Sequence, residues 1–316
     1  MSRNYLDFSV NKKNPFMRDV FIDEIYNYAK KNKDIYFMTP DMGAPSLDRF
    51  RKDLVSQSIH VGISEQNMIT VASGMSVMNK NVICYAMAPF ITSRCYEQIK
   101  CSISAMNQKV TLVGIGVGLG YADAGPTHYT TEDIATMRPF PNIEIITPAD
   151  AYSTKIIASY CAEKPKFRFI RLDRDVLPGI YNKSNFNLTR GFSLLRSGKD
   201  KCIISCGYLL HKALKILKKK KNNFALIDLF RIRPFPKEII KILKKFKEII
   251  VIEEQWVDGG IGSLVLEMLN DNNINIKVTR IGLESDYFFE NGGRDYLHEK
   301  FGLSCKKIEK AIFNYK

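Results

Sequence analysis

The stretch at 60–68, His-Val-Gly-Ile-Ser-Glu-Gln-Asn-Met, contains the residue types of this chain that are best suited to chemistry. Its one carboxylate, Glu65, lies among apolar and small side chains and just before a helical pattern that begins near Ile69. Burial favours the protonated form of a carboxyl group, which suits such a group to hold or share a proton. Spacing alone leaves a second interpretation open, in which Glu65 is a helix N-terminal acid that complements the helix dipole.

There are four further candidates, and three of them stand near the ends of predicted strands, where open α/β sheets collect ligand groups. Asp41 follows a proline at a strand end, and Phe90 offers a flat ring face for stacking. His128 precedes a predicted helix start, and Arg174 has a guanidinium suited to grip a phosphate through two hydrogen bonds. Each candidate has a structural alternative. Asp41 could be a turn residue and Phe90 a core residue. His128 could be a structural histidine, and Arg174 could form an exposed ion pair.

Several short motifs follow one another along the chain. They are Gly-Ile-Ser-Glu-Gln-Asn-Met at 62–68, Gly-Pro-Thr-His at 125–128, Glu-Asp-Ile-Ala at 132–135, Thr-Pro-Ala-Asp at 147–150 and Arg-Leu-Asp-Arg at 171–174. In this order they resemble segments of transketolases and their thiamine-diphosphate relatives. Several motifs in order are more specific than any one motif, and the resemblance runs over nearly the whole chain, from about residue 18 to about residue 302. The chain resembles the C-terminal half of a split transketolase.

The resemblance implies roles for individual residues. Glu65 would hydrogen-bond the aminopyrimidine ring of thiamine diphosphate and favour the tautomer that removes the thiazolium proton. Phe90, followed by Arg94, would stack on that ring, and Asp41 would lie near the thiazolium. The implied substrate contacts are Arg18, Ser46, Asp123, His128 and Arg174, with His128 also able to shuttle a proton. The implied reaction transfers a two-carbon ketol unit from a ketose to an aldose.

Three departures from the family pattern affect the substrate. Gly116 stands where transketolases for pentose phosphates place a histidine, and Ala124 stands where many members place an acid, with Asp123 one residue earlier. The serine expected after Asp41 is displaced, and Ser46 is the nearest candidate. These changes leave the two-carbon chemistry intact, point away from the standard pentose phosphates and leave a nucleotide-linked sugar open.

The family's metal-binding segment is absent. Relatives hold the diphosphate through Mg²⁺ with a Gly-Asp-Gly segment, and this sequence contains no Gly-Asp-Gly. We therefore expect a separate N-terminal transketolase subunit to supply the Mg²⁺–diphosphate site, with no metal ligands in this chain. The cofactor would lie across the interface of an α2β2 assembly formed through homodimerisation, and this chain alone would be inactive.

Two other interpretations remain open from the sequence. One is a 2-oxo-acid dehydrogenase β subunit or a 1-deoxyxylulose-5-phosphate-synthase-like enzyme, which shares the glutamate and the fold but differs around His128. The other is a non-catalytic binding or scaffold protein that kept the fold.

The elements that must position these residues follow from strand–helix alternation. It predicts an α/β fold with two doubly wound domains, each a mostly parallel sheet flanked by helices. We expect a pyrimidine-binding domain at 1–178, a polar connection at 179–190 and a transketolase C-terminal domain at 191–316. One continuous helix is predicted over 93–106. The helices near 293–303 resemble terminal helices that lie outside the family's active site.

Composition narrows the classes of partner that we expect for this chain. The net charge of +14 comes mostly from lysines such as those at 218–221 and 244–245, which lie on the solvent side of predicted helices. Because no aromatic residues are interleaved with these lysines, no nucleic-acid partner is expected. The uncharged run at 110–122 is too short and glycine-rich for a membrane span. Residues 1–15 lack the apolar core of a signal peptide. Seven scattered cysteines without a CxxC pair indicate neither zinc nor disulfides and fit the cytoplasm.

Overall fold

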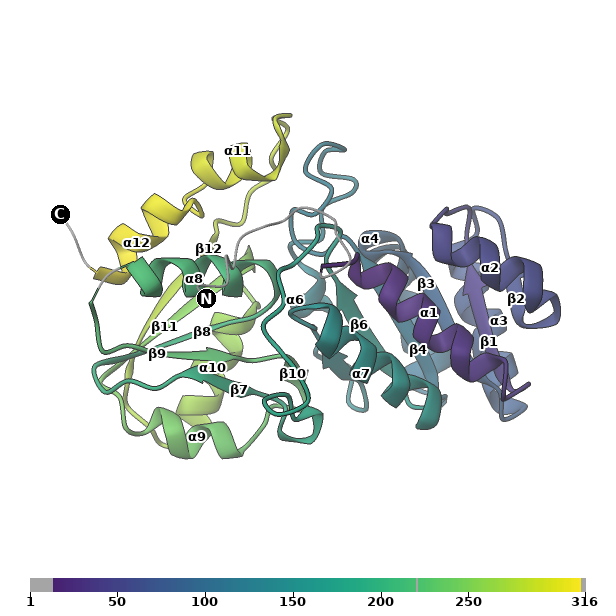
Figure 1. The fold of residues 1–316 in the computed structure, drawn as a ribbon, viewed down its shortest axis with the longest axis horizontal. Helices are drawn as coiled ribbons and strands as arrows, with labels where there is room; N and C mark the ends of the chain where they lie inside the picture. Colours follow the sequence, from purple (N-terminus) through teal and green to yellow (C-terminus); the bar gives the residue numbers. More distant parts are fainter. Residues whose placement is uncertain (1–13, 220, 314–316) are drawn as a thin grey trace.

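The computed structural model describes residues 14–219 and 221–313 and shows two α/β units next to each other (Figure 1). The first unit contains a seven-stranded sheet with the strand order β10-β5-β6-β4-β3-β1-β2. All neighbouring strands in it are parallel except β10, which runs antiparallel to β5. Its strands are β1 (Ile35–Thr39), β2 (Ser58–His60), β3 (Asn81–Met87), β4 (Val110–Ile115), β5 (Glu144–Ile146), β6 (Arg168–Leu172) and β10 (Arg231–Arg233).

Helices cover both faces of this sheet because its strands are apolar on both sides. Along β3, Val82 and Cys84 enter one hydrophobic cluster while Ile83 and Tyr85 enter another, as the alternation of side chains in a strand requires. One face is covered by α1 (Met17–Ala29), α2 (Pro45–Asp53) and α7 (Ala151–Glu163). The other is covered by α3 (Glu65–Val77), α4 (Ala88–Ile91) and α6 (Asp133–Met137).

The segment expected as one helix over 93–106 is irregular. It consists of a 3-10 turn (Ser93–Cys95), the short α5 (Tyr96–Gln98) and a π-helix (Ile99–Ser104). Such local departures from α geometry are frequent at functional sites. Here the first turn holds Arg94 within hydrogen-bond distance of Glu65, so the irregular backbone serves a side-chain contact.

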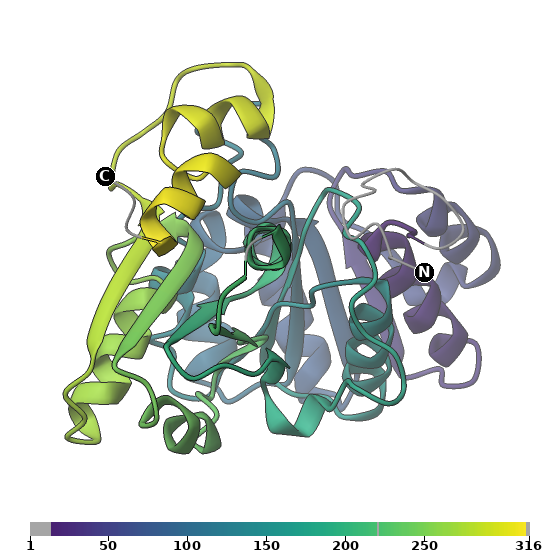
Figure 2. The ribbon, with the colours of Figure 1, turned by 60° about the vertical axis from the view of Figure 1, so that its left-hand side comes forward.

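The second unit contains a five-stranded sheet with the order β12-β11-β8-β9-β7, parallel except for β7 against β9. Its strands are β7 (Ser193–Arg196), β8 (Lys201–Ser205), β9 (Ala225–Asp228), β11 (Glu248–Trp256) and β12 (Lys277–Leu283). Its helices are α8 (Gly207–Lys219), α9 (Glu238–Leu243), α10 (Ile261–Asp271), α11 (Gly293–Lys300) and α12 (Cys305–Phe313). Figure 2 shows the yellow helices α11 and α12 at the end of this unit opposite α9. Two mostly parallel sheets flanked by helices confirm the predicted fold class.

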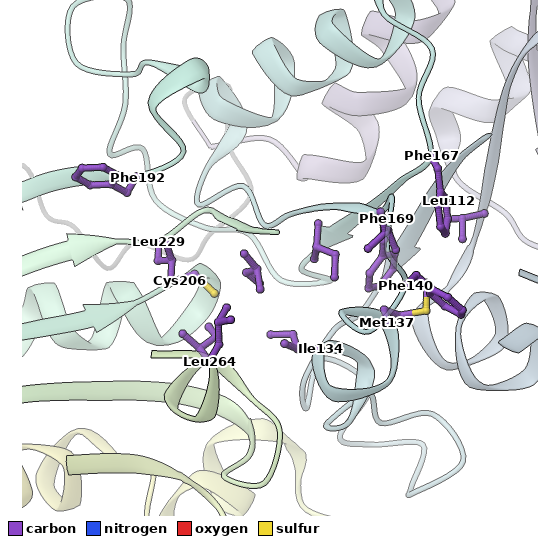
Figure 3. Packing of buried hydrophobic residues seen from close by; sticks show 14 of the residues in the cluster. Leu112, Ile134, Met137, Phe140, Phe167, Phe169, Phe192, Cys206, Leu229 and Leu264 are labelled. Atoms are coloured by element: carbon purple, nitrogen blue, oxygen red, sulfur yellow. The ribbon is translucent and has the colours of Figure 1, made fainter. Parts of the chain in front are cut away.

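The two units share one hydrophobic core. Figure 3 shows Ile134 and Phe169 from the first unit in the same cluster as Leu229 and Leu264 from the second. In addition, β10 lies in the second half of the sequence but extends the first sheet. Apolar burial and sheet pairing therefore both fix the second unit against the first.

The connection at 179–190 is packed against both units. The backbone N–H groups of Ile180 and Tyr181 both donate to Asp150 Oδ2 at 2.7 Å. The Tyr181 hydroxyl donates to Asp228 Oδ2 at 2.6 Å, and its ring contacts Phe186. The connection thus bonds to the first unit through Asp150 and to the second through Asp228.

The surface lysines face the solvent, as expected: those at 218, 219, 221, 244 and 245 are exposed. Position 220 lies outside the described residues. Most of the stretch considered for a signal peptide, residues 1–15, also lies outside them. Within the described ranges, no helix combines the length and the apolar character that a membrane span requires.

Candidate active site

Glu65 is the first residue of α3 and is buried, with 4% of its surface exposed. Its Oε2 accepts a hydrogen bond from Arg94 Nη1 at 2.9 Å, so its surroundings include a charged partner as well as the apolar groups expected from sequence. Glu65 thus begins a helix and is also paired with a neighbouring side chain, and its chemical role stays a prediction.

Phe90 lies in α4, directly after β3, and is half-buried. The guanidinium carbon of Arg94 lies 3.9 Å from the centre of the Phe90 ring, which is a cation–π contact. The ring of His128 meets Phe90 in an edge-on contact, with centroids 5.2 Å apart. Phe90 thus joins Glu65 and Arg94 on one side to His128 on the other.

The loop between β4 and α6 carries His128 and Tyr121. Their ring centroids are 6.4 Å apart, and Thr127 Oγ1 is 2.9 Å from His128 Nδ1. Tyr121 in turn lies beneath Arg174, whose guanidinium carbon is 4.6 Å from the Tyr121 ring centre. A continuous series of side-chain contacts therefore runs from Glu65 to Arg174.

Arg174 ends this series in an ion pair. Its Nη1 donates to Asp123 Oδ1 at 2.6 Å, and this hydrogen bond lowers the pKa of Asp123 and raises the pKa of Arg174. Both residues line a pocket of about 530 Å³, together with Arg18 from the first turn of α1. The structure therefore brings three predicted substrate contacts to one pocket.

Two predicted site residues lie elsewhere. The Asp41 side chain is 70% exposed, and its Oδ1 is 3.8 Å from His60 Nε2. Ser46 lies in the first turn of α2 and is absent from the lining of the Arg174 pocket. Both residues follow β1, which lies between β3 and the edge strand β2.

Gly116 has a structural explanation. Its backbone has a φ of +80°, and a Cβ added there would come within 2.1 Å of Tyr121 Cε2. The ring of Tyr121 thus fills the space that a side chain at position 116 would need. A histidine at 116 is incompatible with this position of Tyr121.

Sequence reasoning missed Arg294 on α11. It is buried, it lines the same pocket as Arg174, and its Nη1 donates to Asp173 Oδ1 at 2.8 Å. Its Nε also donates to Glu254 Oε1 at 2.8 Å. A terminal helix therefore reaches the candidate site, contrary to the expectation that these helices lie outside it. The one signal in the sequence was an arginine that directly follows two glycines and lies in the first turn of a helix.

Glu132 was also missed as a candidate. Burial, followed by the neighbouring charge of Asp133, raises the pKa of Glu132. Its two carboxyl oxygens accept hydrogen bonds from Ser93 and Thr131, both at 3.2 Å. Because Ser93 precedes Arg94, Glu132 supports the turn that presents Arg94 to Glu65.

Comparisons with known proteins identify the family of this chain. Residues 13–179 match the transketolase pyrimidine-binding domain family, and residues 192–308 match the transketolase C-terminal domain family. An apulose-4-phosphate transketolase subunit of Phocaeicola vulgatus is 29% identical over 304 residues, which cover 94% of this chain and 96% of the relative. A 6-deoxy-6-sulfo-D-fructose transketolase subunit of Clostridium sp. is 30% identical over 310 residues, which cover 96% and 95%.

A solved structure described as a split-gene transketolase in an inactive beta4 tetramer has a TM-score of 0.82 and 27% identity, and the match covers 94% of this chain and 97% of that one. Relatives named 1-deoxy-D-xylulose-5-phosphate synthase match over only about half of their length, which favours the transketolase interpretation over that alternative. The chain belongs to the transketolase family, as the part of a split transketolase that carries the pyrimidine-binding and C-terminal domains.

Proposed function

We propose that this chain is the pyrimidine-binding subunit of a thiamine-diphosphate-dependent transketolase that transfers a two-carbon ketol unit from a ketose to an aldose. The observation that carries the proposal is the series of contacts Glu65–Arg94–Phe90–His128–Tyr121–Arg174–Asp123. It joins the residues proposed for the cofactor to those proposed for the sugar.

The side chains fit a pyrimidine ring. Glu65 offers a buried carboxylate, and Phe90 offers the face of a half-buried ring. Arg94 contacts both groups, at 2.9 Å and 3.9 Å. We infer that a pyrimidine ring stacked on Phe90 takes the place of the Arg94 guanidinium, because the two would compete for the same ring face.

When bound, thiamine diphosphate supplies a nucleophilic carbon on its thiazolium ring. The carboxyl oxygens of Glu65 would share a proton with a nitrogen of the pyrimidine ring, and Phe90 would orient that ring by stacking. His128, in contact with Phe90, would hold or move a proton at a substrate hydroxyl. A position of Asp41 near the thiazolium is supported only by the family resemblance. In the structure, the contact of the Asp41 side chain is with His60.

The other end of the sugar would bind in the pocket lined by Arg18, Asp123 and Arg174. The names of two relatives specify a phosphorylated and a sulfonated ketose, apulose 4-phosphate and 6-deoxy-6-sulfo-D-fructose. We propose a sugar or sugar phosphate as the substrate of this chain. Ser46 remains a predicted contact that the pocket geometry does not include.

We propose that a separate N-terminal transketolase subunit binds Mg²⁺ and the diphosphate. The sequence has no Gly-Asp-Gly segment, and no group of three or more His, Cys, Asp or Glu side chains within the described residues is arranged to hold a metal ion. The two subunit relatives named above are themselves covered almost from end to end. A diphosphate site on another polypeptide is consistent with both facts.

An α2β2 assembly through homodimerisation is part of the proposal. Val71 and Val77 on α3, and Met78 and Met106 beside it, are 40–71% exposed. Exposed apolar side chains that gather near one helix are typical of association surfaces. The neighbouring solved structure is itself described as a tetramer of its own chain.

We infer a cytoplasmic location from the cysteines. All seven are free, and burial raises the pKa of Cys95, Cys161 and Cys202 to about 12. Such thiols act as small apolar core groups rather than as disulfide partners. A reducing compartment preserves them in this state.

The experiment that tests the function replaces Glu65 with Gln in the complex assembled with the diphosphate-binding subunit. We expect kcat for ketose-to-aldose transfer to fall by about 10²- to 10⁴-fold, because Gln cannot share a proton with the pyrimidine ring in the way proposed for Glu65. Glu97→Gln, an exposed acid in the same region, is the matched control and is expected to leave kcat unchanged.

Two results would contradict the proposal. An unchanged kcat of Glu65→Gln would favour a non-catalytic scaffold. Turnover by the purified single chain would rule out the requirement for a partner. Offering pyruvate in place of a ketose as donor separates transketolase activity from the 2-oxo-acid dehydrogenase and synthase alternatives.

A further inference from the structure

Another cavity lies at the opposite end of the first sheet from Arg174. It measures about 480 Å³ and is lined by residues of both units, among them Ile143, Lys166, Phe235 and Leu264. We call it the interunit cavity. Ile143 directly precedes β5 and Lys166 lies just before β6, whereas Arg174 follows the far end of β6. The length of a strand therefore separates this cavity from the candidate active site.

The floor of the interunit cavity is apolar. Ile143, Ile232 of β10 and Leu264 of α10 belong to the hydrophobic cluster that the two units share. Phe235 and Met268 pack against this cluster and keep part of their surface exposed. A flat ring and a flexible thioether beside an open space are suited to contact a planar ring. The volume also lies in the range that is typical of small-molecule sites.

Three cationic side chains of the lining have no carboxylate partner among the described residues. Lys166 and Lys237 are exposed and form no hydrogen bond or ion pair with any residue that the structure describes. Arg233 donates a single long hydrogen bond, from Nη2 to the Pro141 carbonyl at 3.5 Å. Their N–H groups are therefore available to an anion that enters the cavity.

The charges of the lining select the chemical class of that anion. The fourth cation, Arg138, is already held by Glu267 through two hydrogen bonds of 2.6 Å. Within the part of the chain that the structure describes, no Asp or Glu lines the cavity. A carboxylate would bring one negative charge to the three remaining cations, whereas a phosphate monoester brings about 1.5 to 2 at neutral pH. Phosphate groups therefore complement this lining better than a carboxylate does.

We propose that the interunit cavity is a binding site for a nucleoside diphosphate. The base lies against Phe235 on the apolar floor, and the phosphates lie among Lys166, Arg233 and Lys237. The site takes no part in the proposed transfer reaction and does not depend on it. Because the floor contains side chains of both units, a nucleotide bound there stabilises their arrangement.

The test titrates the full chain with ADP, adenosine and inorganic phosphate in a calorimeter. We expect ADP to bind more tightly than adenosine or phosphate, because only ADP occupies both the floor and the cations. Replacing Lys166 and Lys237 together with Ala is expected to weaken ADP binding by about 25-fold, roughly fivefold for each exposed charge pair. Phe235→Leu keeps an apolar side chain but removes the flat ring, so it should weaken ADP binding by about 2- to 10-fold and leave phosphate binding unchanged.

Lys245→Ala is the matched control, because Lys245 is an exposed lysine outside the cavity. It accounts for the general attraction of anions to a chain with a net charge of +14 and should bind ADP as the natural protein does. The inference is overturned if ADP shows no saturable binding at millimolar concentration, or if phosphate binds as tightly as ADP. It is also overturned if the double lysine variant binds ADP as tightly as the natural protein, or if Lys245→Ala weakens binding as much as the double variant.

Discussion

Asp228 is fully buried at the end of β9, where it accepts a hydrogen bond from the Tyr181 hydroxyl. Its second oxygen, Oδ1, has no hydrogen-bond partner among the described residues. Burial is the main cause that raises the pKa of Asp228 to about 8, and the charge of Asp150 adds to it. The folded protein therefore holds Asp228 protonated at neutral pH, at the point where the connection at 179–190 meets the second unit.

This protonation predicts a pH-dependent stability. The pKa of about 8 in the folded state exceeds the value of about 3.9 for an unfolded aspartate, so the folded state binds an extra proton between these pH values. The stabilising contribution is complete below about pH 4 and is lost as the pH rises to about 8. Asp228→Asn stays neutral, so we expect its stability relative to the natural protein to rise by at least about 1 kcal/mol between pH 5 and pH 8.

Urea denaturation of both proteins at pH 5, 6, 7 and 8 measures this difference. Asp271→Asn, which removes an exposed carboxylate at the end of α10, is the control and should track the natural protein at every pH. A constant difference between Asp228→Asn and the natural protein across this range would show that Asp228 is already charged at pH 5.

At the residue scale, sequence reasoning worked where a motif fixes a residue at a strand end. Phe90 and Arg174 follow β3 and β6, two parallel strands separated only by β4, so their side chains lie at the same edge of the sheet. It worked less well for Ser46, which was chosen as the nearest serine to a displaced position and lies outside the pocket. An exposed ion pair was the alternative left open for Arg174, but Asp123 was not predicted as its partner, because the contact depends on how the β4–α6 loop folds back on itself.

At the scale of elements, the position of α11 was not foreseen. Its Arg294 lies more than 100 residues from Asp173 in the sequence, and no local pattern indicates which carboxylates it meets. By contrast, the long parallel strands were predictable from apolar runs bounded by helical patterns. The three-residue strand β10 was not, since so short a segment carries no periodic signal.

Arg294 ties α11 to the strand end that presents Arg174. It donates to Asp173, the residue before Arg174, and to Glu254 on β11. Arg294→Met would remove the cation paired with Asp173 and leave Glu254 with His298 as its partner, so we expect a loss of about 3–5 kcal/mol in the free energy of unfolding. The loosened strand end should also raise KM for the sugar more than it lowers kcat, because Arg294 acts on Arg174 rather than on the reacting atoms.

Lys300→Met is the matched control, since Lys300 lies on the same helix and pairs with Glu290 near the surface. It should change the unfolding free energy by less than about 1 kcal/mol. If Arg294→Met does not fold, Arg294→Lys keeps the charge but cannot bond both carboxylates in the same geometry. Equal losses of stability in Arg294→Met and Lys300→Met would contradict the assigned role.

At the scale of the whole molecule, the sequence predicts two domains, while the structure also shows what holds them together. The shared cluster in Figure 3 contains side chains from both sheets. Polar contacts reinforce it, as Arg138 pairs with Glu267 at 2.6 Å and the backbone N–H of Trp256 donates to the Thr131 carbonyl at 3.0 Å. Such contacts between distant segments have no local signature in a single sequence.

A core shared in this way predicts that the two units unfold together. Ile232, the central residue of β10, is fully buried in the shared cluster, and Ile232→Ala is expected to cost about 2–5 kcal/mol. Trp256 is the single tryptophan and reports on the second unit by fluorescence, whereas far-UV circular dichroism reports on both units. In a urea titration we expect the two signals to change at one midpoint, and Ile232→Ala to lower that midpoint equally for both.

Leu194→Ala on β7, which is 40% exposed, is the control and should cost less than about 1 kcal/mol. Two separated transitions, with only one moved by Ile232→Ala, would mean that each unit is stable without the other and that the shared cluster contributes little to either.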